Sequence, residues 1–224
     1  MKSLVRNTHK YLSFFISLQL LLWTVSGIYF AFNKIELVRG EQYLVSVPFS
    51  VDLSQVNLIV SNVEKLSLSK RLDKDVFVAS GTTGKVYLDR NGENINKLST
   101  NEALQIVAEK TALRPHKVEE ISRAVAGSEY RGRSLPLYKV STESDIGERI
   151  NVYVNVFSGD IVAIRSSKWR IWDLLWGLHI IDWEERDNIN NVLLQIFSIL
   201  ALISSITGVL LFFKIDIKKR TPNP

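Results

Sequence analysis

Apolar residues are concentrated in two uncharged blocks near the two ends of the chain. The first covers 11–32 (YLSFFISLQLLLWTVSGIYFAF) and the second 192–213 (VLLQIFSILALISSITGVLLFF), and neither contains Asp, Glu, Lys or Arg. At about 1.5 Å per residue, a helix of this length spans roughly 33 Å, enough to cross a hydrocarbon core of about 30 Å. A core helix of a soluble protein would carry charges on its outward face. The pattern therefore predicts transmembrane helices at 11–32 and 191–213.

The first block also has to be compared with a cleavable signal peptide. Its apolar run is longer than the ~7–15 residues usual for a signal peptide. It ends in the bulky residues IYFAF, whereas a cleavage site needs small residues. We therefore expect an uncleaved membrane anchor.

Basic residues flank both blocks on their outer sides: Lys2, Arg6, Lys10, Lys214, Lys218, Lys219 and Arg220. Short basic flanks stay in the cytoplasm, so 1–10 and 214–224 are predicted to be cytoplasmic. The segment between the blocks then lies on the far side, which is the periplasm for a bacterial inner membrane. The absence of cysteine is compatible with that oxidising compartment. The net charge of +5 comes largely from these flanks, so it favours a lipid bilayer over nucleic acid as partner.

The region between the blocks reads as the same order of elements twice. In the first half, Ser50 can cap a helix over 51–60, and strand-like runs follow at 63–68, 75–80 and 84–95. In the second half, a helix over 101–111 is followed by runs at 118–126, 135–142, 149–156 and 161–165. This order predicts an α+β fold with a duplicated helix-plus-antiparallel-sheet unit, with copies at 33–98 and 99–166. The alternative is an α+β domain that simply contains several glycine turns.

The core of the second copy is predicted from the inward positions of its helix and strands. Its expected members are Leu104, Val107, Tyr138, Val140, Val152 and Val154.

Short motifs in the second half resemble the PepSY domain. The helix NEALQIVAEK, the strand LYKVST and the hairpin INVYVNVFSGDIVAI resemble its EAL-type helix, Y-x-V strand and Y-V-D-x-x-[ST]-G-E hairpin. The matching residues are Glu102, Tyr138, Tyr153, Ser158, Gly159 and Asp160, with Asn155 where the family often has Asp. The spans resemble those of PepSY-associated transmembrane proteins through His9-Lys10 and the small-polar-Gly steps that end at Gly27 and Gly208.

The resemblance implies a two-span member of that group and three kinds of function. PepSY modules inhibit peptidases as parts of propeptides, and they occur as free periplasmic modules that bind other proteins. Larger membrane-embedded relatives act in ferric-siderophore reduction and bind b-type haem through histidines of their spans.

The stretch WRIWDLLWGLH at 169–179 lies between the last strand and the second span. One helical stripe contains Trp169, Trp172 and Trp176 and continues to Ile180 and Trp183. His179 lies at the edge of this stripe. The pattern predicts an interfacial amphipathic helix and bend over 167–190, because tryptophans gather at the membrane interface. Two alternatives are a docking face against the first span or a partner, and a haem site that includes His179.

His9 and His179 are the candidate cofactor-binding residues, as haem ligands. They lie at opposite ends of the first span in the predicted topology, about 30 Å apart. They therefore cannot be the two axial ligands of one haem within one copy of the chain. The prediction is no cofactor, with haem b as the alternative and its second ligand supplied by a partner or a second copy.

Polar and small residues within the spans predict helix packing. They are Gln19, Thr24 and Gly27 in the first span, and Gln195, Thr207 and Gly208 in the second. A lone amide within a bilayer needs a hydrogen-bond partner, and glycine allows helices to approach closely. We expect further membrane subunits or a second copy. In the alternative, the hydroxyl groups bond to carbonyl groups of their own helix.

Motifs for hydrolysis or metal binding are missing from the sequence: it contains no HExxH, no GxSxG and no cysteine. The sequence therefore predicts a non-enzymatic binding or accessory subunit of an inner-membrane complex, with a periplasmic PepSY-type domain. The alternatives are a haem-bearing electron-transfer component of ferric-siderophore reduction and a regulator of a periplasmic peptidase.

Overall fold

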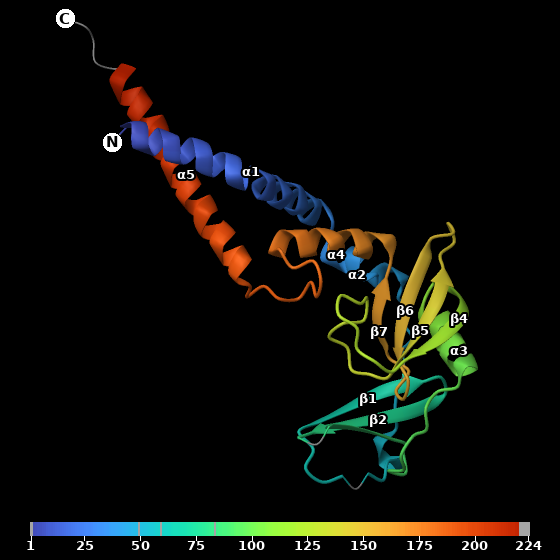
Figure 1. Cartoon of the computed structure of the whole chain (residues 1–224). Helices are drawn as coiled ribbons and strands as arrows, with labels where there is room; N and C mark the ends of the chain where they lie inside the picture. Colours follow the sequence, from blue (N-terminus) through green and yellow to red (C-terminus); the bar gives the residue numbers. More distant parts are fainter. Residues whose placement is uncertain (1, 49, 59, 83, 220–224) are drawn as a thin grey trace, which may run out of the picture. The chain divides into compact units, whose positions relative to one another are not determined.

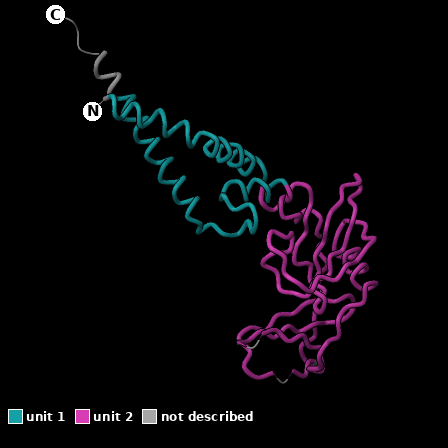
Figure 2. Tube along the Cα trace, in the orientation of Figure 1, with its two compact units in different colours: residues 1–33, 171–224 teal, residues 34–170 magenta. Residues whose placement is uncertain are grey.

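The computed structural model describes residues 2–48, 50–58, 60–82 and 84–219. The chain divides into two compact units, which we describe separately (Figure 2). The helical unit comprises residues 1–33 and 171–224, and the central unit comprises residues 34–170.

Two long helices, α1 (Lys2–Phe32) and α5 (Val192–Lys219), form most of the helical unit (Figure 1). They run antiparallel near the chain termini, where the Ser13 and Ser204 hydroxyls are 2.7 Å apart and the Phe15 and Phe197 rings stack at 6.1 Å. Both helices are long and apolar enough to cross a membrane. The predicted spans are therefore helical. The predicted tail continues α5 as far as Lys219, and Arg220 lies outside the described residues.

The central unit contains two antiparallel sheets. The first has the order β1 (Lys65–Arg71), β2 (Lys74–Gly81), β3 (Gly84–Leu88). The second has the order β4 (Arg114–Ile121), β5 (Leu137–Glu143), β6 (Arg149–Asn155), β7 (Ile161–Arg165). The helix α3 (Thr100–Lys110) packs on β4 and β5, and the short helix α2 (Ile35–Arg39) contacts β7. The predicted α+β class with two flanking apolar helices is confirmed.

The helix α3 begins at a capping box. The hydroxyl of Ser99 accepts from the backbone N–H of Glu102, and the Glu102 carboxylate accepts from the N–H of Ser99. Its inner face joins the second sheet in one hydrophobic core. The predicted residues Val107, Tyr138, Val140, Val152 and Val154 are all buried there, and Leu104 packs against them as a partly buried residue.

The helix predicted over 51–60 is absent from the described part of that segment, which contains only a 3-10 turn at Leu53–Gln55. The carboxylate of Asp52 accepts from the Ser54 N–H and closes this single turn. Valine at 51, 56 and 60 disfavours a longer helix, because β-branched side chains lose rotamer freedom there. The first half therefore has the three predicted strands but not the predicted helix, and the duplication is wrong in this element.

Polar side chains connect β1 to α3 and to the turn between β6 and β7. The guanidinium of Arg71 donates to both carboxylate oxygens of Glu102, at 3.0 and 3.1 Å, and Ser69 donates to Asp160 at 2.8 Å. The Lys110 ammonium donates to the carbonyl oxygens of Lys70 and Gly159. The two sheets are thus joined by buried or half-buried hydrogen bonds.

Candidate functional site

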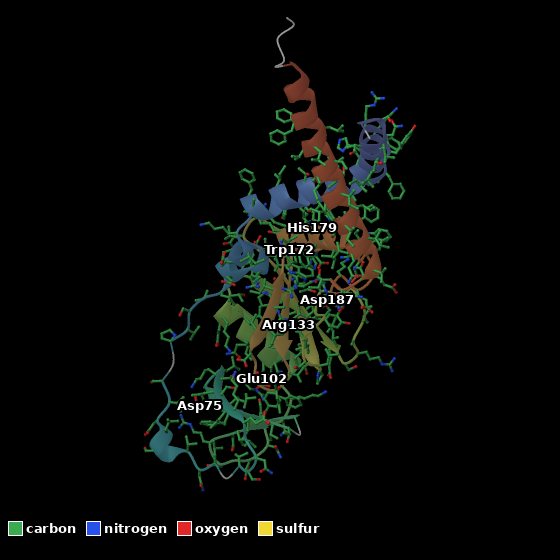
Figure 3. All side chains as sticks on the ribbon, turned by 90° about the vertical axis from the view of Figure 1, so that its left-hand side faces the viewer. Asp75, Glu102, Arg133, Trp172, His179 and Asp187 are labelled. Atoms are coloured by element: carbon green, nitrogen blue, oxygen red, sulfur yellow. The ribbon has the colours of Figure 1, made fainter. Side chains whose placement is uncertain are left out.

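An aromatic cluster surrounds His179 in the helical unit. Helix α4 (Ser167–Ile180) carries Trp172 and His179, which Figure 3 labels, and Trp176 lies between them at helical spacing. The two indoles stack at 5.4 Å, and Trp176 stacks on the imidazole at 6.3 Å with the planes 3° apart. Phe30 of α1 contacts all three rings, with centroid distances between 5.6 and 6.4 Å. The central part of the predicted face, at Trp172 and Trp176, therefore exists, and it packs against α1.

Polar side chains of α1 bond to the last turn of α4. The hydroxyl of Ser26 lies 2.6 Å from Nδ1 of His179. Trp23 donates to the carbonyl oxygen of His179 at 2.7 Å, and Gln19 donates to that of Leu178 at 3.2 Å. The last carbonyl groups of a helix lack partners within the helix, so these bonds satisfy them. The amide predicted to need a partner, Gln19, thus finds one within the same chain.

A second polar cluster surrounds His9, where α1 meets α5. Nδ1 of His9 lies 3.1 Å from the carbonyl oxygen of Ser204 and 3.1 Å from the hydroxyl of Thr207. The Ser13 hydroxyl lies 3.4 Å from the same nitrogen, and in the tautomer with the proton on Nδ1 the imidazole donates to the Ser204 carbonyl oxygen and keeps its lone pair on Nε2. The ring lies on Gly208, where an added Cβ would be 3.1 Å from Cε1 of the imidazole. The sequence singled out His9, Thr207 and Gly208 but not their contact.

The two histidine sites are separate. His9 and Ser26, the partner of His179, are both on α1 and are 17 residues apart (26 − 9), which corresponds to about 25 Å along the helix. This spacing agrees with the expectation that the two imidazoles do not ligate one haem within one copy. In the described residues no group of three or more His, Cys, Asp or Glu side chains could hold a metal ion. His116 is an exposed residue of β4.

The predicted tryptophan stripe is wrong at its two ends. Trp169 is 7% exposed and lies within the central unit, where the Arg165 guanidinium stacks on its indole at 4.3 Å. Trp183 follows the end of α4 at Ile180 and is exposed. On the same helix, Asp173 is buried and accepts from the Arg186 guanidinium at 2.6 Å. The contacts thus favour the docking alternative for Trp172 and Trp176, and their depth in a bilayer stays a prediction.

Three of the predicted packing residues show no hydrogen bond or close approach between helices in the described part of the helical unit. A Cβ added at Gly27 would meet nothing within 4 Å. The exposed hydroxyl of Thr24 bonds to the Leu20 carbonyl of its own helix, and Gln195 bonds to Asn190. The alternative of hydrogen bonds within one helix also holds for Ser17, Ser198 and Ser205. The polar groups of the spans therefore do not by themselves require a further subunit.

A half-buried ionic cluster in the central unit centres on Glu129, which the sequence did not indicate. Its carboxylate accepts from Asn151, Tyr153 and Arg170, and its backbone carbonyl accepts from Arg165. Burial raises the pKa of Glu129, but the three hydrogen bonds outweigh it, and the pKa is lowered overall. Burial, followed by the charge of Arg133, lowers the pKa of Arg165 to about 10, so the guanidinium stays charged at neutral pH. The cluster ties the end of β7 to the start of α4.

An open groove lies beside β1, and we name it the β1 groove. Its volume is about 610 Å³, and consecutive residues of two extended segments line it: Leu44–Val47 and Leu68–Lys70. Leu72, Ile161, Glu109, Lys110 and Asp160 complete its walls. Burial lowers the pKa of the Lys110 ammonium, which bonds to two backbone carbonyl groups there. Leu44, Val45 and Val47 are about half exposed, so this wall is an apolar surface open to solvent.

No model of a known protein family matches the chain, and neither the curated proteins nor the solved structures contain a significant match.

Proposed function

We propose that this chain is a membrane-anchored accessory subunit whose central unit binds a partner protein. The anchoring rests on α1 and α5. Core helices of a soluble protein can have the same length and composition, but they are mostly buried. Here only 17% of the apolar stretch of α1 and 6% of that of α5 is buried. Exposed apolar surface costs about 25 cal/mol per Å² in water, so a bilayer is the environment that suits these helices.

The orientation follows from charge. The basic flanks at 1–10 and 214–224 stay in the cytoplasm, and the central unit lies on the opposite side. We propose the inner membrane of a bacterium, with the central unit in the periplasm. The likeness of 99–166 to PepSY domains supports this location.

The observation that carries partner binding is the β1 groove. Its exposed wall of Leu44, Val45 and Val47 belongs to the unit that faces water, where an apolar surface of this kind marks a protein contact. PepSY modules that occur free in the periplasm bind other proteins, and the resemblance therefore supports the same role. The groove offers apolar side chains and backbone groups, which suit recognition rather than catalysis.

A site-specific crosslink tests this function. The chain has no cysteine, so Val47→Cys gives a unique attachment point for a photoactivated crosslinker in native membranes. We expect an adduct of one defined mass. The matched control is Val125→Cys, an exposed valine in the loop after β4. Equal adducts at both positions, or none at Val47, would contradict the proposal. A peptidase as the crosslinked partner would identify the subunit as a peptidase regulator.

One observation favours the haem alternative. Nδ1 of His9 lies 3.1 Å from a backbone carbonyl oxygen, and in the tautomer with the proton on Nδ1 it donates to that oxygen, as histidines that ligate metals do with their other ring nitrogen. Nε2 of His9 thus suits an axial position, with the second ligand from a partner or a second copy. A reduced-minus-oxidised absorption spectrum tests this function. A haem spectrum that His9→Ala removes and His116→Ala preserves would support it, and haem-free protein from haem-replete cells would refute it.

A further inference from the structure

The hairpin between β1 and β2 determines which way the backbone groups of β1 point. Two residues, Leu72 and Asp73, separate the paired residues Arg71 and Lys74. In a two-residue hairpin the flanking pair exchanges both hydrogen bonds, and such pairs then alternate along the strands. Residues 65, 67, 69 and 71 therefore bond to β2, whereas Leu66, Leu68 and Lys70 direct their N–H and C=O groups away from it.

Two further observations give the same alternation. The Glu64 N–H donates to the Ser80 carbonyl oxygen at 2.9 Å, so residue 80 of β2, and with it residues 78 and 76, points towards β1. The Lys110 ammonium reaches the Lys70 carbonyl from outside the sheet, at 2.6 Å. In the described structure β1 therefore has an open edge at Leu66 and Leu68.

This open edge faces the β1 groove at Leu68, and Leu66 continues the edge beyond the residues that line the groove. Successive side chains of a strand point to opposite faces, so three consecutive residues can line one groove only where the strand edge faces it. Leu68, Ser69 and Lys70 line the groove in this way, opposite the extended segment Leu44–Val47. Lys110 occupies the Lys70 carbonyl, so the backbone groups left for a ligand are those of Leu66 and Leu68.

We propose that an extended segment of the partner protein binds in the β1 groove as an additional strand beside β1. This inference rests on the proposed partner-binding function. An added strand would pair with the N–H and C=O groups of Leu66 and Leu68, which is the recognition mode of β-augmentation. Every second residue of the segment would be apolar, because its side chain would contact the side chains of Leu68, Val45 and Val47. The residues between them face Ser69 and the Asp160 carboxylate, so small polar or basic side chains fit there.

Amide hydrogen exchange on the full chain in lipid nanodiscs tests the pairing. The probe is the seven-residue peptide KVTVTVK. The control is the same peptide N-methylated on its valines, which occupy every second position. At a peptide concentration of about ten times its Kd, the Leu66 and Leu68 amides should exchange roughly tenfold more slowly. The N-methylated peptide cannot donate along one edge and should give no protection. Equal protection by both peptides, or none by either, would overturn the inference.

Two variants separate the backbone from the side chain at the edge. Leu68→Pro removes an N–H that points away from β2, so the ladder between β1 and β2 should persist. Leu68→Ala keeps that N–H. We expect peptide protection of the Leu66 amide to be lost in Leu68→Pro and kept within about threefold in Leu68→Ala. Protected Ser67 and Ser69 amides in both variants would show that β1 remains folded. Equal loss in both variants would show side-chain binding and overturn the inference.

Failure of strand addition can be distinguished from failure of the proposed partner binding, because the crosslink and the peptide protection are measured separately. A crosslink at Val47 without peptide protection would leave partner binding in place and refute strand addition. Protection of Leu66 and Leu68 that rises with protein concentration alone would mean that a second copy covers the edge, and would refute a partner segment. Absence of both the crosslink and the protection would refute both proposals.

Discussion

Gly159 combines an unusual backbone conformation with a close neighbour. Its φ of 70° lies in the left-handed region, and a Cβ there would lie 2.8 Å from Cδ1 of Ile106 in the core. We expect Gly159→Ala to lower the free energy of unfolding by about 1–3 kcal/mol. Gly132 has a similar φ of 71° but open space around it, so Gly132→Ala should cost only about 1 kcal/mol. Denaturant titrations of both variants measure the difference, and equal losses would show that the Ile106 contact is unimportant.

Glu129 gives the central unit a defined response to acid. Its pKa is below the ordinary value of 4.5, because the hydrogen bonds from Asn151, Arg170 and Tyr153 outweigh burial. A lowered carboxyl pKa stabilises the fold above the unfolded value, and this stability is lost as the pH falls through the folded pKa. Between about pH 6 and pH 3, Glu129→Gln should therefore lose less stability than the parent chain.

The comparison uses chemical denaturation at each pH, with Glu120→Gln as control. Glu120 lies on the solvent side of β4 and pairs with the exposed Lys97, so its substitution should leave the slope nearly unchanged. A steeper acid slope for Glu129→Gln than for the parent would contradict the prediction.

At the scale of elements, the last two turns of α4 depend on aromatic contacts with α1. Trp172 and Trp176 contact Phe30, and the Ser26, Trp23 and Gln19 side chains bond only to the end of the helix. Removing both indoles leaves a cavity, which costs about 3–5 kcal/mol for each deeply buried aromatic ring and less for these half-buried rings. The Trp172→Ala, Trp176→Ala double variant should therefore raise amide exchange across 173–180 by more than tenfold. Trp183→Ala, at an exposed position outside α4, should leave it unchanged.

Elements with a strong local signal were predicted well. Ser99 and Glu102 mark the start of α3, and alternating apolar residues mark the strands of both sheets. The N-cap candidate Ser50 favours a helix over 51–60, but the β-branched residues of that segment oppose it. The tryptophan spacing indicates the helical face at Trp172 and Trp176, and docking against the first span is one of its three interpretations. Ser26 and His179 are 153 positions apart, and no local pattern encodes a contact at that separation.

The same limit applies to the candidate sites. His9 and Gly208 were each visible as unusual residues of a span, but their contact depends on how α1 packs against α5. The Glu129 cluster had no signal, because one glutamate in a loop is ordinary until Arg165, Arg170 and Tyr153 meet around it. The β1 groove depends on backbone atoms, which every sequence contains.

At the scale of the whole molecule, two apolar helices with basic outer flanks predict that both chain ends are cytoplasmic. Alkaline phosphatase, which is active only in the periplasm, should be inactive when fused after Pro224 and active when inserted after Val125. A green fluorescent protein fusion after Pro224 should fluoresce. An active phosphatase at the C-terminus would overturn the orientation, and with it the periplasmic location of the central unit.

The open edge of β1 has a consequence for how this protein can diverge during evolution. Recognition through the N–H and C=O groups of Leu66 and Leu68 does not depend on which side chains those positions carry. Natural selection would then act there by exclusion: most residues are acceptable at 66 and 68, and proline is not. The partner's segment would be equally free to drift, provided that it stays extended and alternately apolar. Related chains could thus preserve this interaction while the β1 sequences become unrecognisably different.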